Sequence, residues 1–235
     1  MEKDLRESNL YKNCFGERES GGSAVVFLCS WLLVLLLLFQ AMNWWVTTYG
    51  GVTVKGSSMY QTLQNEDNLL IQYTKSGAVA KRGDIIVVYV GDYEECKSVA
   101  DGYLIKRLIA VEGDKVKCEN EQLYICYAGT DTWVELDEPY AYYGNANSVY
   151  DFGGMIYTVG EDEIFFLGDN RENSCDSRYA QTGGSHLSNR LYKEKDIFGV
   201  VPKWALERKD FFEKLFTAQR KIEKFKAKIK NIFSN

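Results

Sequence analysis

The sequence predicts a mainly β domain that follows one membrane-spanning helix and precedes a basic amphipathic helix. Three features support this: a long uncharged apolar stretch, many short strand-like segments in a chain with sixteen Tyr and only two Pro, and a lysine-rich C-terminal segment. We therefore expect a cytoplasmic segment over 1–23, a transmembrane helix over 24–45, an extracytoplasmic domain over 46–206 and a helical tail over 207–235.

The membrane-spanning helix is predicted by composition and length. No Asp, Glu, Lys or Arg occurs from Ser20 to Val54, and Ala24 to Trp45 is strongly apolar. A helix over that apolar range rises about 33 Å, enough to cross a hydrocarbon core of roughly 30 Å. A cleaved signal peptide is the alternative, but its apolar core would be shorter. Four basic residues precede the helix, so the positive-inside rule predicts a cytoplasmic N-terminus.

Charge is divided unevenly along the chain, whose net charge is −5. Residues 207–235 contain nine basic and four acidic residues, a charge of +5, which leaves −10 for the rest. An acidic main domain argues against a nucleic-acid partner.

Four cysteines lie in the domain expected outside the cell, where disulfides can form. Their spacing fixes no pairing and leaves the reduced state equally open; they are Cys96, Cys118, Cys126 and Cys175. No C-x-x-C pair or His/Cys cluster is present, so we do not expect a structural zinc site.

Short apolar segments bounded by turn residues predict the strands of the domain. They lie at 52–54, 68–73, 84–90, 103–111, 115–118, 122–127 and 163–167. The segment 131–160 is rich in Gly and Tyr and is expected to form loops.

The C-terminal segment has apolar residues at alternating spacings of four and three, which predicts an amphipathic helix of about 25 residues. Lysines fill its other faces, a pattern that suits an anionic membrane surface. A short coiled coil and a helix packed on its own domain are the alternatives. The apolar stripe comprises Phe211, Leu215, Ala218, Ile222, Phe225, Ile229 and Ile232.

Two reactive side chains and one polar loop indicate a catalytic site. Ser58 follows a glycine turn, Lys106 lies in an apolar segment, and residues 168–178 form a dense polar loop. Alone, Ser58 fits a turn residue and Lys106 a half-exposed strand lysine. The chain has a single His, so a serine nucleophile would need another base, and a desolvated lysine can act as one.

These segments resemble those of bacterial type I signal peptidases, which are membrane-bound Ser/Lys endopeptidases. The family's Ser-Met-x-Pro-Thr-Leu segment is similar to residues 58–63, and Arg-Gly-Asp-Ile-Val to residues 82–86. Its lysine segment matches Lys106, Arg107, Gly113 and Asp114, and Gly-Asp-Asn-x-x-Asn-Ser-x-Asp-Ser-Arg matches residues 168–178 in full. The resemblance spans residues 52 to about 203.

The resemblance implies the signal peptidase and LexA-like β-ribbon fold, and roles for particular residues. Ser58 would be the nucleophile, Lys106 the general base, and the backbone N–H of Ser58 an oxyanion donor. Gly56 stands where some members add a serine hydroxyl, so we expect backbone donors, as in the Gram-positive-like branch. The supporting residues would be Ser174, which would hydrogen-bond the lysine, the pair Asp176 and Arg178, and Asp169 with Arg107.

The resemblance also implies a substrate, namely the signal peptides of exported preproteins, cut after small residues in an Ala-x-Ala pattern. It implies that this reaction uses no metal or organic cofactor. An extended segment would add to a strand edge, and shallow apolar pockets would select Ala. Lipid bilayer and secretion machinery are the other expected partners. The residues expected to line the pockets are Val52, Val54, Met59, Leu63, Leu104 and Ile105.

Two positions depart from the family pattern: Gln61 replaces a Pro, and Glu112 replaces a common Pro in the later turn. The single histidine, His186, is not at the lysine position, so we interpret it as a surface loop residue. A non-catalytic bitopic scaffold that binds secreted or pilus-type partners is the alternative function. A self-cleaving LexA-like regulator is a third, which the anchor argues against.

Overall fold

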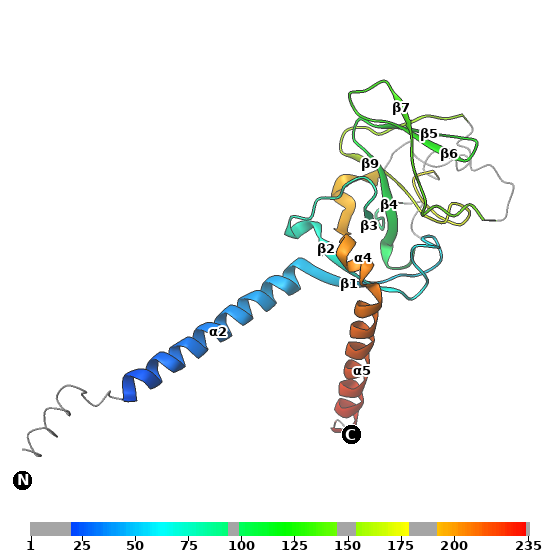
Figure 1. Ribbon diagram of the computed structural model, residues 1–235. Coiled ribbons are helices and arrows are strands. Elements are labelled where there is room, and N and C mark those ends of the chain that lie inside the picture. Colours follow the sequence, from blue (N-terminus) through cyan, green and yellow to red (C-terminus); the bar gives the residue numbers. More distant parts are fainter. Residues whose placement is uncertain (1–19, 94–98, 145–153, 179–191, 234–235) are drawn as a thin grey trace, which may run out of the picture. The chain divides into compact units, whose positions relative to one another are not determined.

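The structure, a computed structural model, describes residues 20–93, 99–144, 154–178 and 192–233 (Figure 1). The chain separates into two compact units, residues 1–46 and 47–235.

The first unit contains most of one long apolar helix, α2 (Ser20–Thr48). Its part from Ala24 to Thr48 is long and apolar enough to cross a membrane, and none of its most apolar window is buried inside the protein. Exposed Leu, Val, Phe and Trp side chains cover it along its length. This is the composition of a helix whose surroundings are lipid. The helix continues three residues beyond Trp45, where the apolar stretch ends.

The second unit is built on a seven-stranded antiparallel sheet in the order β1-β2-β11-β3-β4-β9-β10. The long strand β4 pairs with β3 on one side and β9 on the other, and Arg107 lies opposite Leu167. The strands are β1 (Tyr49–Thr53), β2 (Asn68–Tyr73), β3 (Ile85–Tyr89), β4 (Tyr103–Val111), β9 (Glu163–Leu167), β10 (Tyr192–Lys193) and β11 (Ile197–Val200).

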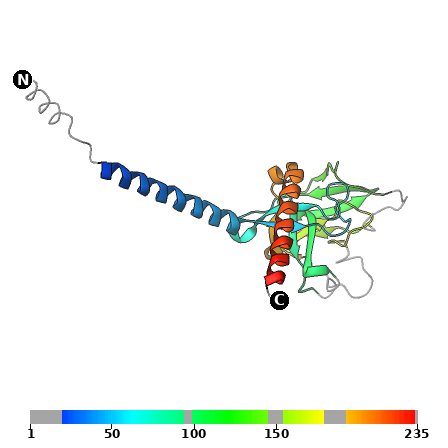
Figure 2. The ribbon, with the colours of Figure 1, turned by 90° about the horizontal axis from the view of Figure 1, so that it is seen from below.

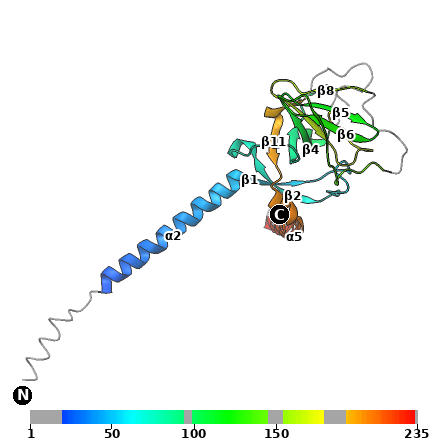
Figure 3. The same ribbon diagram turned by 45° about the horizontal axis from the view of Figure 1, so that its top comes forward.

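A four-stranded antiparallel sheet, in the order β7-β6-β5-β8, lies on the side of the domain away from the C-terminal helix (Figure 3). Cys118 and Cys126 lie at opposite ends of the β5–β6 hairpin. Cys96 lies outside the described residues. The strands are β5 (Lys115–Glu119), β6 (Gln122–Cys126), β7 (Trp133–Glu135) and β8 (Tyr157–Thr158).

The prediction of a mainly β domain is confirmed, and each predicted strand segment overlaps an observed strand, whereas β10 and β11 were not predicted. The prediction of loops throughout 131–160 is wrong at β7, which is three residues long and pairs with β6, and at β8, which is two residues long and pairs with β5. Strands this short give no periodic pattern, because partners distant in sequence define them. In the described connections, the 3₁₀ turns are η1 (Thr74–Ser76), η3 (Ala100–Gly102) and η4 (Glu194–Asp196).

Two helices end the domain, α4 (Lys203–Glu207) and α5 (Lys209–Phe233). Phe212 is buried with Leu70 and Ala205, so α5 starts against β2 (Figure 1). The helix expected here is present, and it packs on its own domain, but through Phe212 and Phe216 and not through the predicted apolar stripe.

Candidate functional site

Ser58 lies in the connection between β1 and β2, where two buried anchors fix the backbone. Met59 and Leu63 are 1% and 0% exposed, in a cluster with Val54. Before the serine, Gly56 adopts a φ of 88°, in the left-handed region where a side chain would be strained. The Gly56 N–H donates to the Asn65 side chain at 2.8 Å. Packing thus holds a partly exposed serine at the end of a strand.

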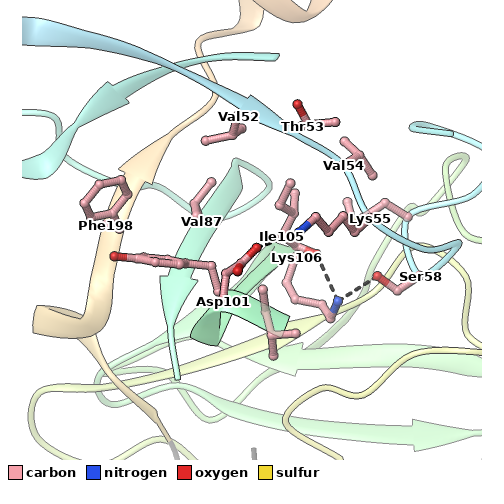
Figure 4. Close-up of a pocket in the computed structure, with 13 residues that line it drawn as sticks. Val52, Thr53, Val54, Lys55, Ser58, Val87, Asp101, Ile105, Lys106 and Phe198 are labelled. Carbon is pink, nitrogen blue, oxygen red and sulfur yellow. Dashed lines mark hydrogen bonds and ion pairs between the residues drawn. The ribbon is translucent and has the colours of Figure 1, made fainter. Parts of the chain in front are cut away.

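Lys106 lies in β4 opposite Ile86 and is 2% exposed. Its amine points at Ser58 and donates to the Ser58 Oγ at 2.7 Å and to the Ile105 carbonyl at 3.0 Å (Figure 4). Burial lowers the pKa of Lys106 from its ordinary 10.5 to about 8, although the Asp176 carboxylate opposes this shift. A substantial fraction of this amine is therefore neutral near pH 8 and able to accept a proton.

The polar loop after β9 holds the serine segment from the other side. Asn170 donates its backbone N–H to the Ser58 carbonyl at 2.9 Å and its side-chain amide to the Ser57 carbonyl at 3.1 Å. The Asn173 side chain donates to the Ser57 hydroxyl at 3.2 Å. The sequence analysis assigned no role to these two asparagines, although both are fixed positions of the polar motif.

Two buried ion pairs brace this loop. Arg107 donates two hydrogen bonds to Asp169, at 2.8 and 2.7 Å, and Arg178 donates two to Asp176, at 2.8 and 2.9 Å. Asp169 also accepts the Thr62 hydroxyl at 2.5 Å, which links the loop to the segment after Ser58. Both aspartates are fully buried. Such two-pronged pairs hold geometry as well as charge.

Tyr140, Tyr143 and Glu138 extend this network beyond the residues that the sequence indicated. The Arg107 guanidinium lies 3.8 Å from the centre of the Tyr140 ring, and Arg171 forms an ion pair with Glu138 at 2.5 Å. These partners come from the segment after β7, which the sequence analysis treated as loop. Only the fold brings them to the site.

Ser174 is 5% exposed, and its hydroxyl has no hydrogen-bond partner among the described residues. The expected hydrogen bond to Lys106 is thus not formed here, where that amine bonds Ser58 and Ile105. The polar loop nevertheless packs closely against Ser58. A Cβ added to Gly168 would lie 2.1 Å from the Ser174 Oγ and 2.5 Å from the Ser58 carbonyl oxygen, so only glycine fits there.

A pocket of about 380 Å³ opens beside Ser58 and Lys106 (Figure 4). All the residues expected to line this pocket do so except Leu63, which is fully buried in the core. The rim carries an ion pair between Lys55 and Asp101 at 2.6 Å. The lining residues from other strands could not be predicted from the sequence, because the pairing of β3, β4 and β11 brings them together. The lining consists of Val52, Thr53, Val54, Lys55, Ser58, Met59, Val87, Asp101, Tyr103, Leu104, Ile105, Lys106 and Phe198.

The backbone N–H of Ser58, expected as an oxyanion donor, makes no hydrogen bond within the described parts of the chain. His186 lies outside the described residues. No cluster of three or more His, Cys, Asp or Glu side chains that could hold a metal occurs in the described ranges.

Comparison with known proteins decides the family. The family model "Signal peptidase, peptidase S26" matches residues 26–205. This chain belongs to the signal peptidase I family. It is 30% identical over 186 residues to "Signal peptidase I P" of Bacillus subtilis subsp. natto, covering 78% of this chain and 90% of that protein. With "Signal peptidase I S" of Bacillus subtilis (strain 168) it shares 35% identity over 134 residues, covering 53% and 64%.

A third relative is "Signal peptidase IB" of Staphylococcus aureus (strain COL), 28% identical over 167 residues and covering 65% of this chain and 78% of that protein. A crystal structure of a signal peptidase I from Enterococcus faecalis V583 has 26% identity and a TM-score of 0.37, covering 53% of this chain and 98% of that one. The chain is thus a type I signal peptidase of the Gram-positive-like branch, a peptidase with an apolar N-terminal helix consistent with a membrane anchor.

Proposed function

We propose that this signal peptidase I removes signal peptides from exported preproteins through a Ser58 acyl-enzyme, with Lys106 as the general base. The observation that carries the proposal is the 2.7 Å contact between the Lys106 amine and the Ser58 hydroxyl oxygen, made by a lysine that is 2% exposed. The family comparisons do not favour a non-catalytic scaffold.

In the acylation step, the neutral Lys106 amine takes the Ser58 proton while the Ser58 Oγ attacks the scissile carbonyl carbon. The resulting ammonium then protonates the leaving amine as the peptide C–N bond breaks, which restores the neutral base. In the second half, water attacks the ester carbon and gives its proton to the Lys106 amine. The ammonium then passes a proton to the Ser58 Oγ as the bond between that oxygen and the carbonyl carbon breaks, which releases the carboxylic acid product and restores Ser58 and the neutral base. Each proton is thus transferred between the Lys106 amine and an oxygen or nitrogen atom that is bonded to the reacting carbon.

The negative charge on the tetrahedral intermediate needs donors already in place. The Ser58 backbone N–H is the proposed donor, since it is not engaged elsewhere in the described structure. The asparagine contacts to the Ser57 and Ser58 carbonyls support this role, because they fix the orientation of the same peptide units.

Specificity for small residues would arise in the pocket beside Ser58. Val52, Leu104 and Ile105 present apolar surface there. Because β1 is the edge strand of the seven-stranded sheet, an extended peptide can add beside it and place alternate side chains in the pocket. Side chains about the size of Ala would fill such subsites, and cleavage would follow the second Ala of an Ala-x-Ala segment.

We also propose the topology, with the N-terminus in the cytoplasm, the peptidase domain outside and the secretion machinery as the source of preproteins. The four basic residues before α2 support this orientation.

The test is incubation of the detergent-solubilised full chain with a preprotein that carries an Ala-x-Ala site. Wild type should cleave after the second Ala, whereas Ser58→Ala and Lys106→Ala should not. Lys115→Ala, an exposed lysine of the second sheet, is the matched control and should cleave normally. Cleavage by a folded Ser58→Ala variant would refute the proposal.

A further inference from the structure

The helix α5 has two apolar faces, and among its described side chains one face packs on the protein while the other is exposed. Phe212 is 5% exposed and packs with Leu70 and Ala205. One turn further, Phe216 lies over Gly51, where even an added Cβ would meet its ring at 2.7 Å. Arg220 donates to the Asn68 side chain at 3.1 Å. These contacts fix the first three turns of α5 against β1 and β2.

The second face is the apolar stripe that the sequence predicts, and it is exposed. The exposed fractions are 62% for Phe211, 51% for Leu215, 55% for Ile222 and 64% for Phe225. The spacing of these residues places them in one row along the helix. A contiguous apolar row of this kind, with two Phe, is unusual on a surface that faces water.

Basic side chains flank the exposed row. At 3.6 residues per turn, Lys214 and Lys221 lie on one side of it and Lys226 lies on the other, and all three are exposed. Lysines in these positions can lay their carbon stems along an apolar surface and reach outward with the ammonium group. Of the nearby carboxylates, Glu213 lies on another face, whereas Asp210 lies beside Lys214 and Lys221. The described residues that flank the row are therefore mainly basic, three lysines against one aspartate.

The start of α5 is tied to the residue that follows the apolar N-terminal helix. Tyr49 comes directly after α2, and its ring packs on Trp204 with centroids 6.0 Å apart. Trp204 in turn packs on Phe212, with centroids 5.8 Å apart. Two ring contacts therefore link the first turn of α5 to Tyr49, the residue that directly follows α2 in the sequence.

We propose that the exposed row of α5 lies in the interface of an anionic lipid bilayer and docks the peptidase domain on the membrane surface. The apolar row supplies burial among the acyl chains, and the lysine border supplies attraction to anionic headgroups. The link through Tyr49, Trp204 and Phe212 favours lipid over a soluble partner, because it ties the start of α5 to the residue that directly follows the apolar helix in the sequence. In Figure 2, α5 runs along one side of the domain as a single straight element. This surface is separate from the pocket beside Ser58.

The test uses the full chain in nanodiscs of phosphatidylcholine, with or without phosphatidylglycerol, and follows tryptic cleavage after Lys214 and Lys221 by mass spectrometry. We expect cleavage to slow about tenfold when phosphatidylglycerol is present, since each basic residue near the surface adds attraction. High salt should remove most of the protection.

Two double variants decide which face is responsible. Leu215→Glu/Ile222→Glu places charge on the exposed row and should abolish the protection. Thr217→Glu/Gln219→Glu adds the same charge off the row and should retain it. Both variants leave Phe212 and Phe216 in place, and circular dichroism and thermal unfolding would verify their fold. Equal cleavage in both lipid compositions would overturn the proposal. Protection that requires two copies per disc would also overturn it, by assigning the row to a second copy of the chain.

Discussion

The Lys106 amine lies 2.7 Å from the Ser58 hydroxyl oxygen, although 48 residues separate them in the chain. Two strands of one sheet produce this contact: β1 leads into the serine turn, and β4 carries the lysine. The amine is buried, so the contact joins a nucleophile to a base whose proton is held weakly.

Burial of the lysine should reduce stability. Because the folded-state pKa is lowered to about 8, the folded protein binds fewer protons than the unfolded chain between about pH 8 and 10.5. Wild-type stability should therefore rise with pH across that window. Lys106→Met should be more stable than wild type by about 3 kcal/mol below pH 8, and the difference should vanish above about pH 10.5. Denaturant unfolding of the full chain in detergent at several pH values measures this. A difference that does not change with pH would contradict the assignment.

Removal of the Asn170 side chain should impair catalysis more than substrate binding. Asn170→Ala removes the hydrogen bond to the Ser57 carbonyl but keeps the backbone bond to Ser58. One hydrogen bond is worth about 1 kcal/mol, so we expect kcat to fall about fivefold with little change in KM. The Asn170→Asp variant, which replaces the donor by an acceptor, should have a kcat at least as low as that of Asn170→Ala. Normal kcat in both variants would remove Asn170 from the positioning role.

The Arg107–Asp169 pair should be important for stability because Asp169 is fully buried. Arg107→Met leaves that carboxylate without its cation and should cost about 3–5 kcal/mol of unfolding free energy. The double variant Arg107→Met/Asp169→Leu should recover part of the loss, since no unpaired charge remains. Lys55→Met, which breaks the exposed pair with Asp101, is the control and should change stability little. If Arg107→Met were as stable as the double variant, the stabilising role of this pair would be contradicted.

The pocket predicts how specificity can be changed. Ile105→Ala enlarges the apolar lining, and the relative kcat/KM for Leu over Ala at the cleavage position should rise about tenfold, within the range for small volume changes. Ile125→Ala is the matched truncation in the core of the second sheet and should leave this ratio unchanged. An unchanged ratio for Ile105→Ala would place the cleavage-site subsite elsewhere.

Local sequence patterns predicted much of this architecture. The apolar alternation and turn residues around 68–73, 103–111 and 163–167 have their own periodic signal, and these segments are strands. By contrast, β7 and β8 exist only through pairing with distant partners, and a short Gly- and Tyr-rich segment does not reveal such pairing. The amphipathic period of α5 predicted a helix, but could not tell that Phe212 and Phe216 would pack inward.

The candidate site, like the fold, was predictable only in part from local sequence patterns. Motif resemblance drew attention to Ser58, Lys106 and the polar loop, and the fold brings them together. The resemblance did not indicate that Leu63 would be buried in the core. It also did not indicate that Val87 and Phe198 would line the pocket from two other strands. Those placements depend on sheet order, which no local pattern contains. The Tyr60–Gln61 peptide bond, at the position where the family has Pro, is cis.

The most direct test of the central claim is the pH dependence of kcat/KM for cleavage of an Ala-x-Ala preprotein by the full chain. Only the neutral Lys106 amine can accept the Ser58 proton, so activity should rise with pH through a single ionisation near pH 8, where burial places the pKa of Lys106. A profile that is flat from about pH 6 to 9, for a protein that stays folded throughout, would contradict Lys106 as the base.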